Sequence, residues 1–135
     1  MRPSHPDPEV ESYLKKAERD LATASRMSES GSDFADIVCF HAEQCAEKSL
    51  KGLILALGET PPRSHDLVLL QKNLREIDDT IDYFETNCLV LADYAVSPRY
   101  PGWEDLVGIV DLMEIRKAAE AILSRVLARL GLESK

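Results

Sequence analysis

One stretch of this chain, Phe40–Gly52, has the clearest pattern in the sequence and reads FHAEQCAEKSLKG. Its polar residues recur at steps of three and four, which places them on one face of an α-helix. This polar row combines an imidazole, an amide and two ammonium groups: His41, Gln44, Lys48 and Lys51. The opposite face is mainly small, which allows another helix to approach closely: Ala42, Cys45, Ala46, Ser49 and Leu53. We therefore predict an amphipathic helix within a bundle, and we suspect a site along the polar row.

Helical patterns continue on both sides of this stretch. Apolar residues at helical spacing follow Pro8, and Gly58 is a stop signal after the central helix. Asp78 and Asp79 are typical of a helix start. Five helices are expected, beginning near residues 8, 33, 65, 78 and 103. Long helices joined by short loops predict an antiparallel, up-and-down bundle.

The composition is that of one globular domain. Of the 135 residues, 44% are hydrophobic and 30% are charged, which is ordinary for a protein with a sizeable core. Only 6% are aromatic, and six glycines and seven prolines are too few for the many turns of a sandwich or barrel. We expect a single all-α domain over residues 1–135, with an extended lead-in at 1–8 and a tail at 131–135.

Charge and cysteine content exclude several classes of protein. The net charge of −8 opposes broad binding to DNA or RNA. An odd number of cysteines without metal-ligand spacing indicates buried free thiols in a reducing compartment. No apolar run approaches the roughly 20 residues that span a bilayer. We expect a cytoplasmic protein without a membrane segment, and without a bound metal or other cofactor. The three cysteines are Cys39, Cys45 and Cys88.

Four pieces of the sequence, taken in order, resemble the HEPN domain family (higher eukaryotes and prokaryotes nucleotide-binding), in its small stand-alone prokaryotic form. The resemblance covers about residues 9–128. It implies a five-helix fold built on a four-helix up-and-down bundle. It also implies frequent homodimers, and prokaryotic members encoded beside a minimal nucleotidyltransferase in toxin–antitoxin-like pairs. The pieces are Ala17-x-x-Asp20-Leu21, His41-x-x-Gln44-x-x-Glu47-Lys48-x-x-Lys51, Pro62-x-x-His65-Asp66-Leu67 and Arg99-Tyr100-Pro101.

The chain departs from the family in one important respect. Many HEPN proteins are metal-independent ribonucleases, with an arginine followed after four to six residues by a histidine. The histidines of this chain are His5, His41 and His65, and none follows an arginine at that spacing. RNA cleavage needs a proton-transfer group and a cation that converge on one phosphate. The sequence therefore argues against an enzyme with the usual HEPN site.

Candidate ligand-binding residues extend the polar row into the loops. Arg63, His65 and Arg99 add groups that can meet a phosphate, and Tyr100 offers a ring for base stacking. No glycine-rich phosphate loop is present, so side chains would have to recognise a nucleotide. The full candidate set is His41, Gln44, Lys48, Lys51, Arg63, His65, Arg99 and Tyr100.

Each feature also has a structural interpretation. Glu47 and Lys51 can form a surface pair four residues apart, and His41 can be a buried, hydrogen-bonded histidine. His65 and Asp66 can cap the third helix. Stability alone could explain the pattern.

Three functions follow from these observations. The leading one is a homodimeric HEPN binding and partner protein, which engages a nucleotidyltransferase and a nucleotide or short RNA. The second is a ribonuclease toxin with a non-standard site that uses His41 or His65 with Lys48 or Arg99. The third is a structural helical module, in which the polar row only sets the register.

Overall fold

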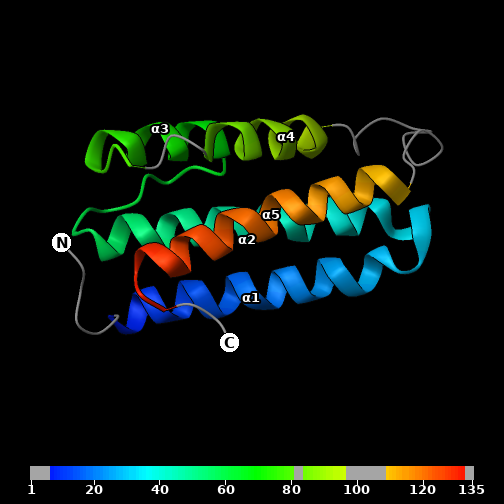
Figure 1. The fold of residues 1–135 in the computed structure, drawn as a ribbon, viewed down its shortest axis with the longest axis horizontal. Helices are drawn as coiled ribbons and strands as arrows, with labels where there is room; N and C mark the ends of the chain where they lie inside the picture. The colour runs from blue at the N-terminus through cyan, green and yellow to red at the C-terminus, as the bar shows by residue number, and fades with distance from the viewer. Residues whose placement is uncertain (1–6, 81–83, 97–108, 133–135) are drawn as a thin grey trace.

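The computed structural model describes residues 7–80, 84–96 and 109–132, and these residues are almost entirely helical (Figure 1). The result confirms the prediction of an all-α fold. The elements are α1 (Pro8–Ser28), the short 3-10 helix η1 (Gly31–Phe34), α2 (Ala35–Ala56), α3 (Leu67–Ile77), α4 (Phe84–Val96) and α5 (Ile109–Arg129).

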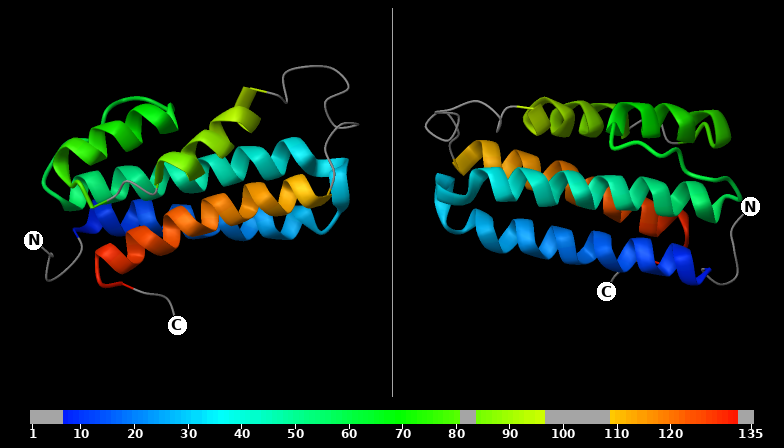
Figure 2. Two further views of the ribbon diagram at one scale, coloured as in Figure 1. Left: turned by 45° about the horizontal axis from the view of Figure 1, so that its top comes forward. Right: turned by 180° about the vertical axis from the view of Figure 1, so that it is seen from behind.

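The helices form an up-and-down bundle in which α2 is central. α1 runs antiparallel to α2, and α5 runs beside α2 in the same direction (Figures 1 and 2). α3 runs in the same direction as α2 and ends beside Leu57 and Arg129, and α4 then runs in the opposite direction. α2 contacts α1, α3, α4 and α5. α1, α2, α4 and α5 therefore alternate in direction as a four-helix up-and-down bundle, and α3 is the fifth helix, as predicted.

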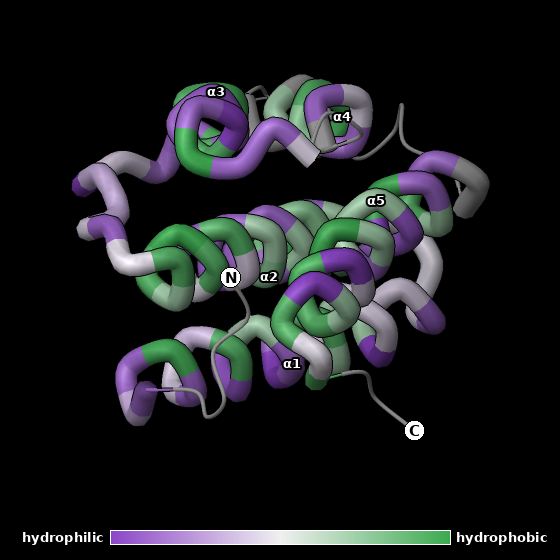
Figure 3. Tube along the Cα trace, turned by 60° about the vertical axis from the view of Figure 1, so that its left-hand side comes forward, coloured by the Kyte–Doolittle hydropathy of each residue, from purple (hydrophilic) through white to green (hydrophobic). Residues whose placement is uncertain are grey.

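The small face of α2 lies in the core. At Gly52, an added Cβ would lie 3.2 Å from the Cβ of Tyr13, so α1 and α2 approach too closely for a larger side chain. Hydrophobic and hydrophilic segments alternate along each helical coil in Figure 3, as expected for helices with one buried face. The predicted core residues of α2 are all buried: Ala42, Cys45, Ala46, Ser49 and Leu53.

Local signals set several helix ends. The Asp7 carboxylate accepts a hydrogen bond from the Glu9 amide at 2.8 Å and caps α1. Gly58, with a φ of 92°, follows α2 in a conformation that favours glycine. The Asp66 carboxylate accepts from the first free amides of α3, which confirms the capping interpretation of that residue. These ends position the α2–α3 loop, residues 57–66.

The predicted start of the fourth helix is wrong. Asp78 ends α3, and α4 begins at Phe84. One oxygen of the Asp78 carboxylate accepts from the amide and the hydroxyl of Thr80, and the other accepts from Arg129 Nε at 2.8 Å. Because a turn and a distant arginine use both oxygens, the carboxylate does not cap a following helix. The predicted fifth-helix start, near residue 103, lies outside the described residues.

None of the helices in the described ranges is long and apolar enough to cross a membrane.

Candidate functional site

The polar row of α2 is half-buried, and its two ends contact different parts of the bundle. All four of its side chains are of intermediate exposure. His41 lies at the N-terminal end of the row, where it contacts Asp20 of α1. Lys51 lies at the other end, beside Glu47 and the α2–α3 loop. The side chains of the row are therefore partly packed against neighbouring segments rather than fully solvated.

At the N-terminal end of the polar row, the Asp20 carboxylate of α1 orients the His41 ring. His41 Nδ1 lies 2.8 Å from Asp20 Oδ1, and both side chains are largely buried. An ionised carboxylate only accepts hydrogen bonds, so His41 Nδ1 carries the proton and Nε2 has the lone pair when the ring is neutral. The Phe40 ring meets the imidazole edge to face, with centroids 5.2 Å apart and an interplanar angle of 84°. The interpretation of His41 as a hydrogen-bonded histidine is thus confirmed.

At the other end, a buried carboxylate gathers three basic side chains. The Glu47 side chain is only 2% exposed. Its Oε1 lies 2.8 Å from His65 Nδ1, while Oε2 accepts from Lys51 Nζ at 3.2 Å and lies 3.9 Å from Lys48 Nζ. A buried carboxylate without such partners would cost several kcal/mol, roughly the desolvation penalty of one ion. We call Glu47, Lys48, Lys51 and His65 the Glu47 cluster.

The sequence interpretation of Glu47 and Lys51 as a surface pair is half correct. The pair forms, but the carboxylate is buried because the chain returns through the α2–α3 loop and places His65 against it. A pair on an open helix surface would contribute about 0.5 kcal/mol or less. Here the same two residues are part of a cross-linked, partly desolvated group.

The Glu47 cluster has surplus positive charge. Two lysines against one glutamate leave a net charge of +1 with His65 neutral. Lys48 Nζ also donates to Gln44 Oε1 at 2.7 Å, so its position is held from two sides. Arg63 is exposed on the adjacent loop and has no ion-pair partner among the described residues. Positive groups held in place before a ligand arrives suit a small anion such as a phosphate.

The structure brings four of the eight predicted site residues together, whereas His41 contacts Asp20 and Arg63 is exposed on the loop. Contacts link Gln44 to Lys48, and Glu47 links Lys48 and Lys51 to His65. Arg99 and Tyr100 lie outside the described residues. Sequence reasoning did not assign Asp20, Glu47 or Phe40 to the site. The sequence did contain a signal for Asp20 and Glu47. Each carboxylate lies in one of the family-like pieces, and a carboxylate that faces the interior of a bundle needs a polar partner there.

Comparison with known proteins identifies the family. The family model of the HEPN domain matches residues 10–130. The chain belongs to the HEPN domain family. The fold of this HEPN domain is similar to that of TT1696 from Thermus thermophilus, with 25% identity, a TM-score of 0.79, and coverage of 92% of this chain and 100% of the other. It is also similar to ST0689, an archaeal HEPN homologue, with 26% identity, a TM-score of 0.72, and coverage of 90% and 97%. No curated protein sequence matches the chain significantly.

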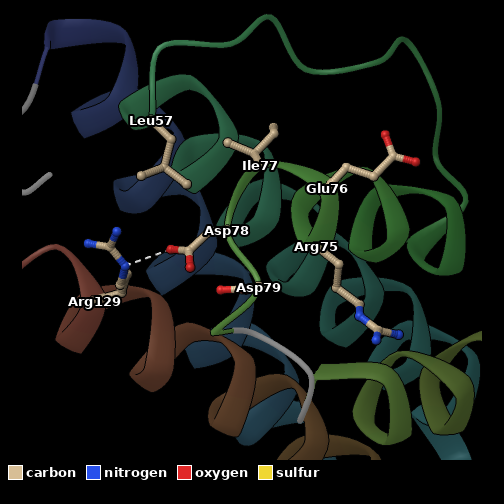
Figure 4. Close-up of a pocket in the computed structure, with 7 residues that line it drawn as sticks. All are labelled: Leu57, Arg75, Glu76, Ile77, Asp78, Asp79 and Arg129. Carbon is tan, nitrogen blue, oxygen red and sulfur yellow. Dashed lines mark hydrogen bonds and ion pairs between the residues drawn. The ribbon is translucent and has the colours of Figure 1, made fainter.

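A hollow of the HEPN domain lies where α3 and α5 end, with a volume of about 490 Å³. Figure 4 shows that its two arginines, Arg75 and Arg129, point away from each other. Arg129 pairs with Asp78, and Arg75 lies 3.5 Å from Glu85 of α4. These cations do not converge on a common point, so the polar row is the better candidate for an anion.

Proposed function

We propose that this HEPN domain is a non-catalytic binding protein. Its polar row binds the phosphate of a nucleotide or of a short RNA, and the protein acts as a homodimer beside a minimal nucleotidyltransferase. The observation that supports the ligand is the surplus positive charge of the half-buried Glu47 cluster. In such a setting a phosphate is screened less by solvent than on an open surface.

The pairing of the basic groups supports binding more than catalysis. Glu47 holds Lys51, whose side chain is only 12% exposed, so little of the entropy of that side chain remains to be lost when an anion binds. The arginine and histidine of the usual HEPN ribonuclease motif are absent. The site therefore offers charge and hydrogen-bond donors without the family's pair of catalytic groups.

The partner part of the proposal rests on the family and on an apolar groove. HEPN proteins of the small prokaryotic type are expected to dimerise and to pair with a nucleotidyltransferase. Val90 of α4 and Met113 of α5 line a mostly apolar groove, and Met113 is 42% exposed. Exposed apolar surface of this kind is typical of protein-binding faces.

Calorimetry tests the ligand. ATP, GTP and AMP are titrated into the wild type, into Lys48→Met and into Lys72→Met, a control on the exposed side of α3. Loss of Lys48 should weaken binding about 10- to 150-fold, since a charge-assisted hydrogen bond contributes about 1.5–3 kcal/mol. Lys72→Met should bind like the wild type. Heat within error of zero for all three nucleotides would contradict nucleotide binding. Equal weakening of binding in Lys48→Met and Lys72→Met would contradict the polar row as the binding site.

Co-expression tests the partner. The nucleotidyltransferase encoded beside this gene, where one is present, should co-purify with the wild type and less with Met113→Lys. Light scattering over a range of concentrations gives the mass of the chain alone. A monomer at every concentration would contradict the homodimer.

A specific observation also favours a second candidate function, a ribonuclease with a non-standard site. His41 and His65 each contact a carboxylate through Nδ1, which leaves Nε2 of both rings available for proton transfer. RNA incubated with wild type, His41→Ala and His65→Ala distinguishes the candidates. Cleavage that either substitution abolishes would replace the binding proposal, whereas no cleavage at high protein concentration would exclude the nuclease.

A further inference from the structure

The residue that neither the polar row nor the Glu47 cluster explains is Phe40. Its side chain is 57% exposed, although it lies in the central helix of the bundle. Lone exposed leucines are common on protein surfaces, but a phenylalanine beside a row of polar groups has a ring face that can stack. Seen from behind in Figure 2, α2 lies in front of α5, and no described helix covers it on that side.

Phe40 lies in line with the polar row. At 3.6 residues per turn, Phe40, Gln44, Lys48 and Lys51 fall within an arc of about 80° on the surface of α2. The rise from Phe40 to Lys48 is about 12 Å, and to Lys51 about 16 Å. The order along the helix is therefore an aromatic ring, an amide and then two ammonium groups.

The ring is supported from behind. The imidazole of His41 meets it edge to face, and Asp20 of α1 holds that imidazole through Nδ1. A ring supported in this way loses less freedom on stacking than a ring on a free side chain. The side-chain carbonyl oxygen of Gln44 accepts a hydrogen bond from Lys48. The two N–H groups of the same amide have no partner among the described residues. They are available to an acceptor on the edge of a base.

We infer that Phe40 is the base-stacking platform of the site, so that a bound nucleotide lies along α2 with its base on Phe40 and its phosphates toward Lys48, Lys51 and Arg63. This inference rests on the proposed nucleotide binding and adds the orientation of the ligand. A monophosphate reaches Lys48, while the longer chain of a di- or triphosphate extends to Lys51 and the α2–α3 loop. Affinity should therefore rise from adenosine to AMP, ADP and ATP.

The test separates stacking from other roles of an apolar side chain. Phe40→Leu keeps an apolar group of similar reach but removes the ring face, and Phe40→Trp keeps a ring. Phe34→Leu is the matched control, because Phe34 is also an exposed phenylalanine and lies outside the row. Calorimetry with adenosine, AMP, ADP and ATP gives the affinities, and light scattering gives the mass of each variant.

Stacking predicts that Phe40→Leu weakens all three nucleotides by the same factor, about 5- to 100-fold, because the base is common to them. Phe40→Trp and Phe34→Leu should bind like the wild type, and Lys48→Met should weaken AMP and ATP but not adenosine. If the wild type binds and Phe40→Leu binds equally well, the stacking inference is wrong while the nucleotide proposal stands. A lower mass for Phe40→Leu would show a protein contact instead and would also overturn it. If the wild type binds no nucleotide, both proposals fail.

Discussion

Among the described residues of this HEPN domain, buried polar side chains have hydrogen-bond partners, except for two atoms of α3, Gln71 Nε2 and Asn73 Oδ1. Asp20 and Glu47 each have a histidine or lysine partner. Gln71 of α3 is 1% exposed, and its Nε2 donates no hydrogen bond to any residue that the structure describes. A buried amide donor without a partner costs about 1–3 kcal/mol.

Gln71→Met should therefore stabilise the protein by about 1 kcal/mol, since methionine has a similar length and helix propensity and no donor to satisfy. The midpoint of urea unfolding measures the change. Lys72→Met, on the exposed side of the same helix, controls for the general effect of methionine and should leave the midpoint unchanged. A lower midpoint for Gln71→Met would mean that the amide has a partner in solution.

The three cysteines should be unreactive in the folded protein. They are buried, as predicted, and burial raises the pKa of Cys39, Cys45 and Cys88 to about 12 each. The thiolate is the reactive species, and almost none is present at pH 8. A coloured disulfide reagent should label the native protein slowly and all three thiols after denaturation. Rapid labelling of one thiol in buffer would contradict this.

At the scale of the elements, helix pairs are held by close approach in one place and by an ion pair in another. Gly52 lets α2 approach Tyr13 of α1. Arg129 of α5 holds the end of α3 through Asp78. Both contacts join segments far apart in the sequence, so they determine which helices are neighbours.

Gly52→Val should destabilise the protein by about 2 kcal/mol, because the added groups must push α1 away from α2. Chemical denaturation gives the difference in the free energy of unfolding. Ala128→Val, on the exposed side of α5, carries only the propensity cost of a branched residue and should lose a few tenths of a kcal/mol. Equal losses for the two variants would argue against close packing at Gly52.

The contact between Asp78 and Arg129 should depend on pH. Burial by itself would raise the pKa of Asp78, whose side chain is 9% exposed, but hydrogen bonds from Thr80 and Arg129 outweigh burial and lower it. A lowered pKa means that the ionised form stabilises the fold above the usual value near 4, and that this stability is lost as the pH falls through the lowered value.

Arg129→Met should therefore cost about 1–2 kcal/mol at pH 7, and the difference from the wild type should shrink below about pH 4. Lys117→Met on the exposed side of α5 is the control, with no comparable loss. Unfolding curves at pH 3, 5 and 7 measure the effect. A constant difference over this range would exclude the charge of Asp78 as its cause.

At the scale of the whole molecule, the chain has a net charge of −8, yet the polar row places Lys48 and Lys51 beside a single carboxylate. α2 is in contact with every other α-helix, yet one side of it carries the polar row and the exposed Phe40. The mostly apolar groove between α4 and α5 is a separate surface. Ligand and partner are therefore expected on different faces.

If the protein is a homodimer, its thermal midpoint should rise with protein concentration, because association stabilises only the folded chain. Met113→Lys should lower both the midpoint and its concentration dependence if the groove of α4 and α5 is the interface. Calorimetric scans over a hundredfold range of concentration make the comparison. A midpoint independent of concentration for the wild type would contradict the dimer.

Much of the fold could be predicted because it depends on patterns that are local in the sequence. The small face of α2, the glycine after it and the Asp66 cap follow from helical spacing and from which residues satisfy free amides. The start of α4 could not be predicted, because the two oxygens of the Asp78 carboxylate accept hydrogen bonds from Thr80 in a turn and from Arg129, 51 residues away. A carboxylate at a helix start and one at a helix end look alike in a sequence.

The same distinction holds for the candidate site. From the sequence alone, the all-α class, the HEPN resemblance and the positions of the polar row follow, since each depends on spacing along one helix. Only the tertiary structure decides which charges are paired with one another, because Glu47 meets His65 through a loop and His41 meets Asp20 across two helices. It also decides that Phe40 stays exposed while Glu47 is buried, since exposure depends on which neighbouring segments cover α2.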